Sequence, residues 1–467
     1  MYYKAEEPDF GMSADKRSAA ILGPGGEAYP LVTAAISPGG GIDLFAGGEG
    51  VKLGGRFRVG RPARVIYVGN SLVDSYGGYS DASGWWSANS FILHTIQRLG
   101  PLIDMRNRMT VGSDANYWDR WGNIGHGGAT LDTITADILT SGVLAQMATD
   151  SVLPPDIVVG AALLENDIAG GASFETCKTR LLRYLDRVEA VWPGVNHLIA
   201  TPWASVNYNT ADKRQVADQV RAYILSLPSL RENVDAADVS RLYCGDDWIP
   251  YPGLTDGIHP ANTTTTVPAR VGRVFAAALR RMLGGQATFG LQIKSPNIGL
   301  TGSIAASAPA TGTAPSNTIF SGAAITGGSV VSVAENPGWK ITYTNADGGA
   351  EKDFGTFALT GIVPSDLTKV DPVISFEIES GAENVVAFTV QVRMRYSDLT
   401  NDFREITRKQ SSYVNGEWLD GEGMNFVAPR VLPTGGKTLT SVEIYVKLHA
   451  KAQVGTTVIR VKALGTL

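Results

Sequence analysis

The sequence predicts an α/β protein with a doubly wound parallel sheet, a C-terminal all-β sandwich and a Gly-rich N-terminal arm. Over residues 63–285, apolar strand-like runs alternate with amphipathic helical stretches, which is the pattern of a parallel sheet covered by helices. Residues 326–467 contain strands in which polar and apolar residues alternate, as in half-buried antiparallel strands. Residues 1–62 hold 13 glycines and show no helical period, which favours an arm or a small β region over a self-sufficient domain.

The elements of the α/β region follow from its hydrophobic pattern. Short apolar runs predict strands at residues 65–68, 103–110, 157–164, 197–200 and 233–236. Amphipathic stretches predict helices at residues 85–98, 131–147, 174–191, 211–225 and 269–283. Within 174–191, an apolar stripe recurs at helical spacing through Leu181, Leu182, Leu185 and Val188. A parallel sheet of this kind places its site at the carboxyl ends of the strands.

The C-terminal part changes to a strand pattern. Strands are expected at residues 339–343, 373–378, 385–396 and 442–448. Over 385–396 the polar residues Thr389, Gln391, Arg393 and Arg395 alternate with apolar ones, so we expect a β-sandwich that serves as a carbohydrate-binding or assembly module. Residues 286–325 are rich in Ala, Ser, Thr and Gly and indicate a linker or an edge region.

Composition excludes several classes of protein. The chain has 40 Lys and Arg against 45 Asp and Glu, so no basic excess points to nucleic acid or an anionic membrane. Two cysteines, Cys177 and Cys244, rule out a disulfide-built scaffold and are expected to be buried free thiols, with a single bridge as the alternative. The N-terminus lacks the apolar core of a signal peptide, and no apolar run predicts membrane insertion.

Two segments of the α/β region carry candidate functional groups at strand ends. Ser71 follows the strand at 65–68 directly, so its hydroxyl and its N–H belong to the carboxyl edge of the sheet. A serine there can also be an ordinary helix N-cap. Gly128 lies in the sequence NIGHGGAT, just before a predicted helix, where a backbone N–H can face a ligand. The alternative for this segment is an ordinary tight turn.

Two further segments add an amide, an imidazole and a carboxylate. Asn166 follows the strand at 157–164 and could donate a hydrogen bond to an oxyanion, although Asn-Asp is also a common turn. Asp256 lies three residues before His259, at a spacing that lets the carboxylate orient the imidazole. Asp256 and His259 could instead be metal ligands, but no His-rich cluster accompanies them, so neither metal nor cofactor is expected.

Together the four segments resemble, in order and spacing, the SGNH (GDSL-like) hydrolase family over residues 63–285. The segments DGIHP and NIGHGGAT match the family strings closely. Two positions depart from them: Asn70 gives GNSL where GDSL is usual, and Leu164 stands where the family has glycine. The resemblance implies a flavodoxin-like α/β fold and a carboxylic ester hydrolase.

By this resemblance the site residues take defined roles. Ser71 would be the nucleophile, His259 the general base and later the acid, and Asp256 the group that holds His259. The oxyanion hole would consist of the Ser71 N–H, the Gly128 N–H and the Asn166 side chain. A serine hydroxyl needs such an adjacent base because it is a poor nucleophile at neutral pH.

Aromatic residues near the four segments suggest the substrate. Seven of the nine tryptophans lie in 63–285, and those proposed to bind substrate are Trp85, Trp86, Trp118, Trp121, Trp203 and Trp248. Flat aromatic faces suit sugar rings, whereas the alternative is that several of these side chains fill the core. The interpretation is a serine esterase that removes acyl groups, O-acetyl above all, from a carbohydrate.

The flanking regions suggest where such an enzyme acts. The stretch GTAPSN and the later PGWKIT are similar, more loosely, to linker-plus-sandwich modules of phage tail and tailspike proteins that carry SGNH domains. This resemblance implies an acylated polysaccharide substrate, phage tail or virion proteins as partners, a homotrimer, and a virion or extracellular location without a signal peptide, otherwise a cytoplasmic one. Two rivals remain: a non-catalytic adhesin on the same scaffold, and a thioesterase or lipase-type enzyme.

Overall fold

The structure is a computed structural model of the chain. Its described residues are 16–22, 28–36, 42–46, 49–51, 63–73, 86–87, 90–99, 103–104, 117–119, 123–140, 155–251, 257–259, 267–283, 295–297, 300–306, 310–321, 327–335, 338–364, 367–368, 370–408, 417–427, 431 and 433–466. In some strand and helix segments only the backbone is described, including all those before residue 63.

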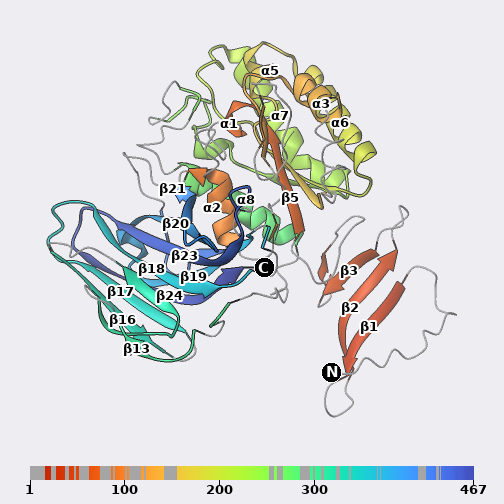
Figure 1. Cartoon of the computed structure of the whole chain (residues 1–467). Helices are drawn as coiled ribbons and strands as arrows, with labels where there is room; N and C mark the ends of the chain where they lie inside the picture. The colour runs from red at the N-terminus through yellow and green to blue at the C-terminus, as the bar shows by residue number, and fades with distance from the viewer. Residues whose placement is uncertain are drawn as a thin grey trace.

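A predominantly parallel sheet forms the centre of the α/β region (Figure 1). Its strands are β5 (Ala63–Gly69), β7 (Ile103–Asp104), β8 (Tyr117–Asp119), β9 (Asn123–His126), β10 (Ile157–Gly160), β11 (Asn196–Ala200) and β12 (Val234–Ala237). The order is β12-β11-β10-β5-β9-β8, with β7 also paired to β5, and only β8 runs antiparallel to its neighbour. This is the flavodoxin-like order, so the predicted fold class is confirmed. The chain reverses direction of winding between β5 and β10, which makes their carboxyl ends the switch point where sites form.

Helices cover the sheet in two groups. Helices α2 (Phe91–Leu99) and α8 (Val267–Met282) pack against each other, while α6 (Phe174–Val191) packs against both α3 (Leu131–Thr140) and α7 (Ala211–Leu230). The stripe predicted on α6 is buried at Leu181, Leu185 and Val188, with Cys177 and Tyr184 completing it and Leu182 only half-buried. The hydroxyls of Ser173 and Thr210 accept backbone N–H groups at the starts of α6 and α7, which satisfies donors left free at a helix start.

Two predicted elements of this region were wrong in extent or kind, and one helix was not predicted. The strand expected at 157–164 ends at Gly160, because Ala162 takes a left-handed φ of 53° and turns the chain. The helix α5 (Glu165–Ala169) follows and was not predicted. The helix expected at 85–98 starts only at Phe91, and Trp86–Ser87 forms a short strand, β6, instead. The residues after Gly160 stay buried, so their hydrophobicity resembled a longer strand.

Two mainly antiparallel sheets make the C-terminal region, as predicted, with parallel pairing only between β14 and β16 and between β6 and β21 among the described strands. One has the order β13-β14-β16-β17-β24-β19-β22 and the other β15-β18-β23-β20-β21-β6. Their strands are β13 (Ile304–Ala305), β14 (Thr311–Ala314), β15 (Thr318–Ser321), β16 (Gly328–Ala334), β17 (Trp339–Asn345), β18 (Lys352–Ile362), β19 (Pro372–Ser380), β20 (Val385–Tyr396), β21 (Asn401–Arg408), β22 (Gly423–Val427), β23 (Leu439–Ala450) and β24 (Gly455–Thr466). Aromatic pairs join the sheets: Trp339 meets Phe357, and Phe376 meets Phe388. These rings form the sandwich core.

The region before the parallel sheet contains four strands in one antiparallel sheet. They are β1 (Lys16–Leu22), β2 (Ala28–Ile36), β3 (Ile42–Ala46) and β4 (Glu49–Val51), paired in sequence order. The structure therefore has a small β region here, one of the two forms expected from the glycine-rich composition. Of the helices in the described ranges, none is long and apolar enough to cross a bilayer.

The α/β region and the sandwich make direct contact. The short strand β6 from the α/β region pairs in parallel with β21, at the edge of a sandwich sheet. Helix α2 packs against β22, and Arg98 on α2 forms an ion pair with Glu422 next to β22 at 2.9 Å. In Figure 1 the sandwich accordingly lies beside α2 and α8.

Candidate active site

Ser71 stands in a tight turn at the carboxyl end of β5. The strand ends at Gly69, and Ser71 begins the short helix α1 (Ser71–Val73). The Asn70 N–H donates to the Ala162 carbonyl at 3.2 Å, which straps this turn to the chain that leaves β10. Any side chain at residue 69 would meet the Ala161 carbonyl oxygen, at 1.9 Å from an ideal Cβ, so the close approach of the two chains requires glycine here.

The structure brings Ser71 and His259 together. The Ser71 Oγ and His259 Nε2 lie 2.9 Å apart, within hydrogen-bond distance, although 188 positions separate the residues in the chain. The loop that carries His259 is held from the neighbouring segment, since the Val206 N–H donates to the Gly257 carbonyl at 3.0 Å. Asp256 lies outside the described residues, so its predicted contact with His259 stays a prediction.

Gly128 and Asn166 are connected through Ala129, the residue that follows Gly128 in the chain. The Asn166 Nδ2 donates to the Ala129 carbonyl at 2.8 Å, and Gly128, with a left-handed φ of 75°, is exposed beside it. The next carboxylate, Asp167, accepts the Leu131 N–H at 2.9 Å and so fixes the start of α3. Two adjacent side chains of α5 thus hold the Gly128 loop at the carboxyl edge of the sheet.

The carboxyl group of Glu165 is a site feature that sequence reasoning missed. Glu165 is buried, and burial raises its pKa to about 7. Its Oε2 accepts the Asn70 Nδ2 at 3.2 Å, and its Oε1 accepts the Trp203 N–H at 2.9 Å. The signal in the sequence was an acidic residue at the end of an apolar run, next to Asn166. Burial also raises the pKa of Asp167, although Arg180 pairs with it.

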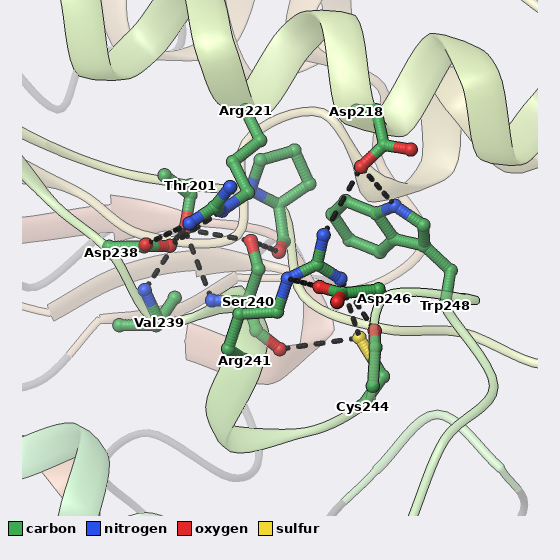
Figure 2. A network of polar contacts seen from close by, with 12 residues as sticks. Thr201, Asp218, Arg221, Asp238, Val239, Ser240, Arg241, Cys244, Asp246 and Trp248 are labelled. Atoms are coloured by element: carbon green, nitrogen blue, oxygen red, sulfur yellow. Dashed lines mark hydrogen bonds and ion pairs between the residues drawn. The ribbon is translucent and has the colours of Figure 1, made fainter.

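Two of the predicted sugar platforms belong to the core. Trp203 is 0% exposed and stacks on Tyr243 at 4.7 Å between ring centroids. Trp248 is 1% exposed, and its Nε1 donates to Asp218 at 2.8 Å. Figure 2 shows Trp248 and Asp218 in a polar network with Arg241, whose guanidinium lies 5.0 Å from the Trp248 ring. Neither ring face is open to a ligand, so these two predictions were wrong.

The remaining predicted platforms lie where the structure describes no side chain. Trp85 and Trp121 lie outside the described residues. Trp86 belongs to β6 and Trp118 to β8, where the structure describes the strand but not the side chain. Trp86 is placed by its backbone opposite Thr407 of β21, so the segment after the Ser71 turn touches the edge of the sandwich.

Potential metal ligands are scattered in the described part of the chain. Within those ranges, no group of three or more His, Cys, Asp or Glu side chains is arranged to hold a metal ion. Cys177 and Cys244 are free and buried, as the sequence predicted. Burial raises the pKa of the Cys244 thiol to about 11, which keeps it protonated and unreactive near neutral pH.

Comparison with known proteins gives structural matches to part of the chain. No protein-family model and no curated protein matches it. A family 3 carbohydrate esterase from Clostridium thermocellum matches with a TM-score of 0.34 and 17% identity, over 48% of this chain and 98% of the esterase. A family 3 carbohydrate esterase from Talaromyces cellulolyticus matches with 0.31 and 16%, over 48% and 100%. A GDSL-like lipase from Bacteroides thetaiotaomicron matches with 0.31 and 14%, over 48% and 88%.

Proposed function

We propose that the chain is a serine esterase that uses Ser71 as nucleophile and His259 as general base. The observation that carries the proposal is the 2.9 Å approach of the Ser71 Oγ to the His259 Nε2 at the switch point of the sheet. A hydroxyl within hydrogen-bond reach of an imidazole is the basic unit of nucleophilic acyl transfer. The Gly128 loop and the Asn166 amide lie at the same edge and supply candidate donors for an oxyanion.

The proposed reaction proceeds in two halves. His259 takes the Ser71 proton as Oγ attacks the ester carbonyl carbon, and the tetrahedral oxyanion forms opposite the donors. Collapse breaks the bond to the alcohol oxygen, which leaves with the proton from His259, and an acyl-enzyme on Ser71 remains. Water, deprotonated by His259, then attacks the acyl carbon. Collapse of this second tetrahedral intermediate breaks the bond between the acyl carbon and the Ser71 Oγ. It releases the carboxylic acid, such as acetic acid, while His259 returns the proton to Ser71.

The substrate class we propose is an acylated carbohydrate, with acetyl as the acyl group. The support comes from the sequence positions of Trp85, Trp86, Trp118 and Trp121 near the candidate site, and from the contact of β6 with the sandwich. We further propose that the protein acts in a virion or extracellular setting and forms a homotrimer. Both proposals rest on the looser resemblance to phage tail modules. Light scattering on the purified protein would contradict the trimer by giving a monomeric mass.

The nucleophile assignment can be tested directly. Ser71→Ala is expected to abolish hydrolysis of 4-nitrophenyl acetate and release of acetate from O-acetylated polysaccharides, because no oxygen remains to form the acyl-enzyme. A matched control is Thr389→Ala, since Thr389 also hydrogen-bonds an imidazole, that of His449, but lies on β20 of the sandwich. This control should keep full activity.

The same assay separates the rival functions. Hydrolysis that persists in folded Ser71→Ala would overturn the proposal. An inert wild type would favour the adhesin. Faster turnover of acyl-thioesters than of acetylated sugars would favour the thioesterase.

A further inference from the structure

Glu165 connects the ends of three neighbouring strands. It begins α5 just after β10, and its side chain accepts one hydrogen bond from Asn70 after β5 and another from the Trp203 backbone after β11. Both donors belong to loops at the carboxyl edge of the sheet. One of them, Asn70, precedes the proposed nucleophile Ser71 directly. A buried carboxyl group therefore lies behind the turn that must hold Ser71 against His259.

The hydrogen bonds fix the direction of the Asn70 amide. Its Oδ1 accepts the Leu72 N–H at 3.0 Å, so its Nδ2 must face Glu165. The Glu165 carboxylate then has two donors for its two oxygens, and every polar atom in this chain of contacts has a complementary partner. A carboxylate at residue 70 would instead put two negative oxygens next to each other in a buried place, which is strongly unfavourable.

We propose that Glu165 is a positioning residue for Ser71, acting through Asn70, and that the amide at 70 and the acid at 165 depend on each other. This inference rests on the proposed esterase function. It also accounts for Asn70, which stands where the resembling family has Asp. The amide at residue 70 is the donor that the acid at residue 165 requires.

The surroundings of Glu165 determine how it responds to pH. Its other titratable neighbours are Asp167 on the same helix, Cys177 on α6, and Tyr208 and Tyr243 beyond β11 and β12. Of these only Asp167 is a carboxyl group, and Arg180 pairs with it. Burial is the main cause that raises the pKa of Glu165 to about 7. A proton on Glu165 removes one acceptor, either for Asn70 or for Trp203, so acidification should loosen the Ser71 turn.

The pairing predicts a specific rescue. In Glu165→Gln the new amide keeps its oxygen toward the Trp203 N–H and turns its NH₂ against the Asn70 NH₂, which leaves two donors facing each other. In Asn70→Asp two carboxyl groups face each other, and they repel once both are ionised. Each change alone should lower kcat/KM about tenfold or more, in Asn70→Asp at a pH at which both carboxyl groups are ionised. When Asn70→Asp and Glu165→Gln are combined, the new amide at position 165 donates to the new carboxylate at position 70. That carboxylate still accepts the Leu72 N–H, so activity should return to within about threefold of wild type.

The experiment is a double-mutant cycle in kcat/KM for 4-nitrophenyl acetate on the full chain, with denaturant unfolding of every variant. On acidification through the pKa of Glu165, kcat/KM of the wild type should fall further than that of the double variant, because the double variant has no carboxyl group at residue 165. Glu443→Gln, which alters a buried acid on β23 of the sandwich, is the matched control and should leave both the rate and its pH dependence as in the wild type.

Distinct results would overturn the inference. Unimpaired single variants, or a double variant as slow as the slower single one while folded, would show that the two residues do not form a pair. If a single variant does not fold, folding of the double variant still supports the pairing, and its failure to fold overturns it. Hydrolysis that survives Ser71→Ala would defeat the esterase proposal instead, and the cycle in unfolding free energy would then still decide whether the residues are paired.

Discussion

Asn166 has two tasks that one side chain can serve together. Its Nδ2 donates to the Ala129 carbonyl, and this bond holds the loop that presents Gly128. An amide NH₂ carries two hydrogens, so the bond to Ala129 occupies one and orients the other. The role proposed from sequence and the position found in the structure are therefore compatible: the contact that fixes the loop also fixes the donor.

Replacement of Asn166 should affect the chemical step. We expect Asn166→Ala to lower kcat by roughly 10²–10³, with KM little changed, because a preorganised donor acts on the charge that develops in the transition state. Steady-state kinetics with 4-nitrophenyl acetate measures this. Asp167→Asn is the control: it weakens the neighbouring hold on the same loop through Leu131 and Arg180 but keeps the Asn166 amide. An equal loss of kcat in both variants would reduce Asn166 to a loop anchor.

The strand β11 carries an unusual buried side chain where it packs beneath α6. His197 is 0% exposed, and neither of its ring nitrogens has a hydrogen-bond partner in the described structure. Tyr184 of α6 lies next to it, with ring centroids 6.5 Å apart. Burial, followed by the charge of Arg231, lowers the pKa of His197 from 6.5 to about 4. The strand therefore accepts a neutral imidazole and excludes a protonated one.

This side chain should make stability depend on pH. Between about pH 6.5 and pH 4 the unfolded chain binds a proton at His197 that the folded chain does not, so stability is complete above this window and falls as the pH is lowered through it. The loss is up to about 3 kcal/mol. His197→Phe should remove that part of the loss. Urea unfolding at pH 7.5 and pH 4.5 measures it.

A second buried histidine, His94, also contributes to the fall of stability at low pH. His94 on α2 is also buried, and its pKa is lowered by burial and by Arg98 and Arg273, so some loss of stability should persist in His197→Phe. If the unfolding free energy of this variant fell with pH as steeply as that of the wild type, His197 would not be the source.

At the scale of the whole molecule, a charged junction lies between the α/β region and the sandwich. Glu422 accepts hydrogen bonds from Arg98 of α2 and Arg273 of α8, and Arg98 also lies 5.2 Å from the Trp418 ring. The Arg98 side chain is only 5% exposed. Such a cation is tolerated because its partner is ionised, and accordingly the two arginines lower the pKa of Glu422 against the effect of its burial.

Loss of this acid should destabilise the full chain. We expect Glu422→Ala to lower the free energy of unfolding by about 3–5 kcal/mol, since it leaves Arg98 buried without its carboxylate. Denaturant unfolding followed by tryptophan fluorescence measures this. The control is Glu377→Ala, which breaks a more exposed pair with Lys462 on the sandwich and should cost no more than about 1 kcal/mol. Equal effects would show that the junction carries no special stability.

Local pattern was sufficient for much of the fold and part of the site. The helix at 174–191 and the strand at 385–396 were predicted closely because their period reflects one buried face, and the strand at 197–200 because it is a short run that is buried throughout. The residues Ser71, Gly128, Asn166 and His259 were proposed because short segments at strand ends carry their chemistry within a few positions, and their roles are still predictions. Asp256 was proposed on the same grounds and remains a prediction.

Other features depended on contacts between distant segments. Trp203 and Trp248 are core residues, since an aromatic ring near a strand end serves a pocket or a core equally well in sequence. Trp86 joins the sandwich because β21 offers an unpaired edge far along the chain. Glu165 faces Asn70 only once β5 and β10 lie side by side. The order of residues thus sets the hydrophobic period and the chemical groups at each strand end. Packing selects which of those groups meet, because burial and hydrogen-bond pairing are properties of the folded chain.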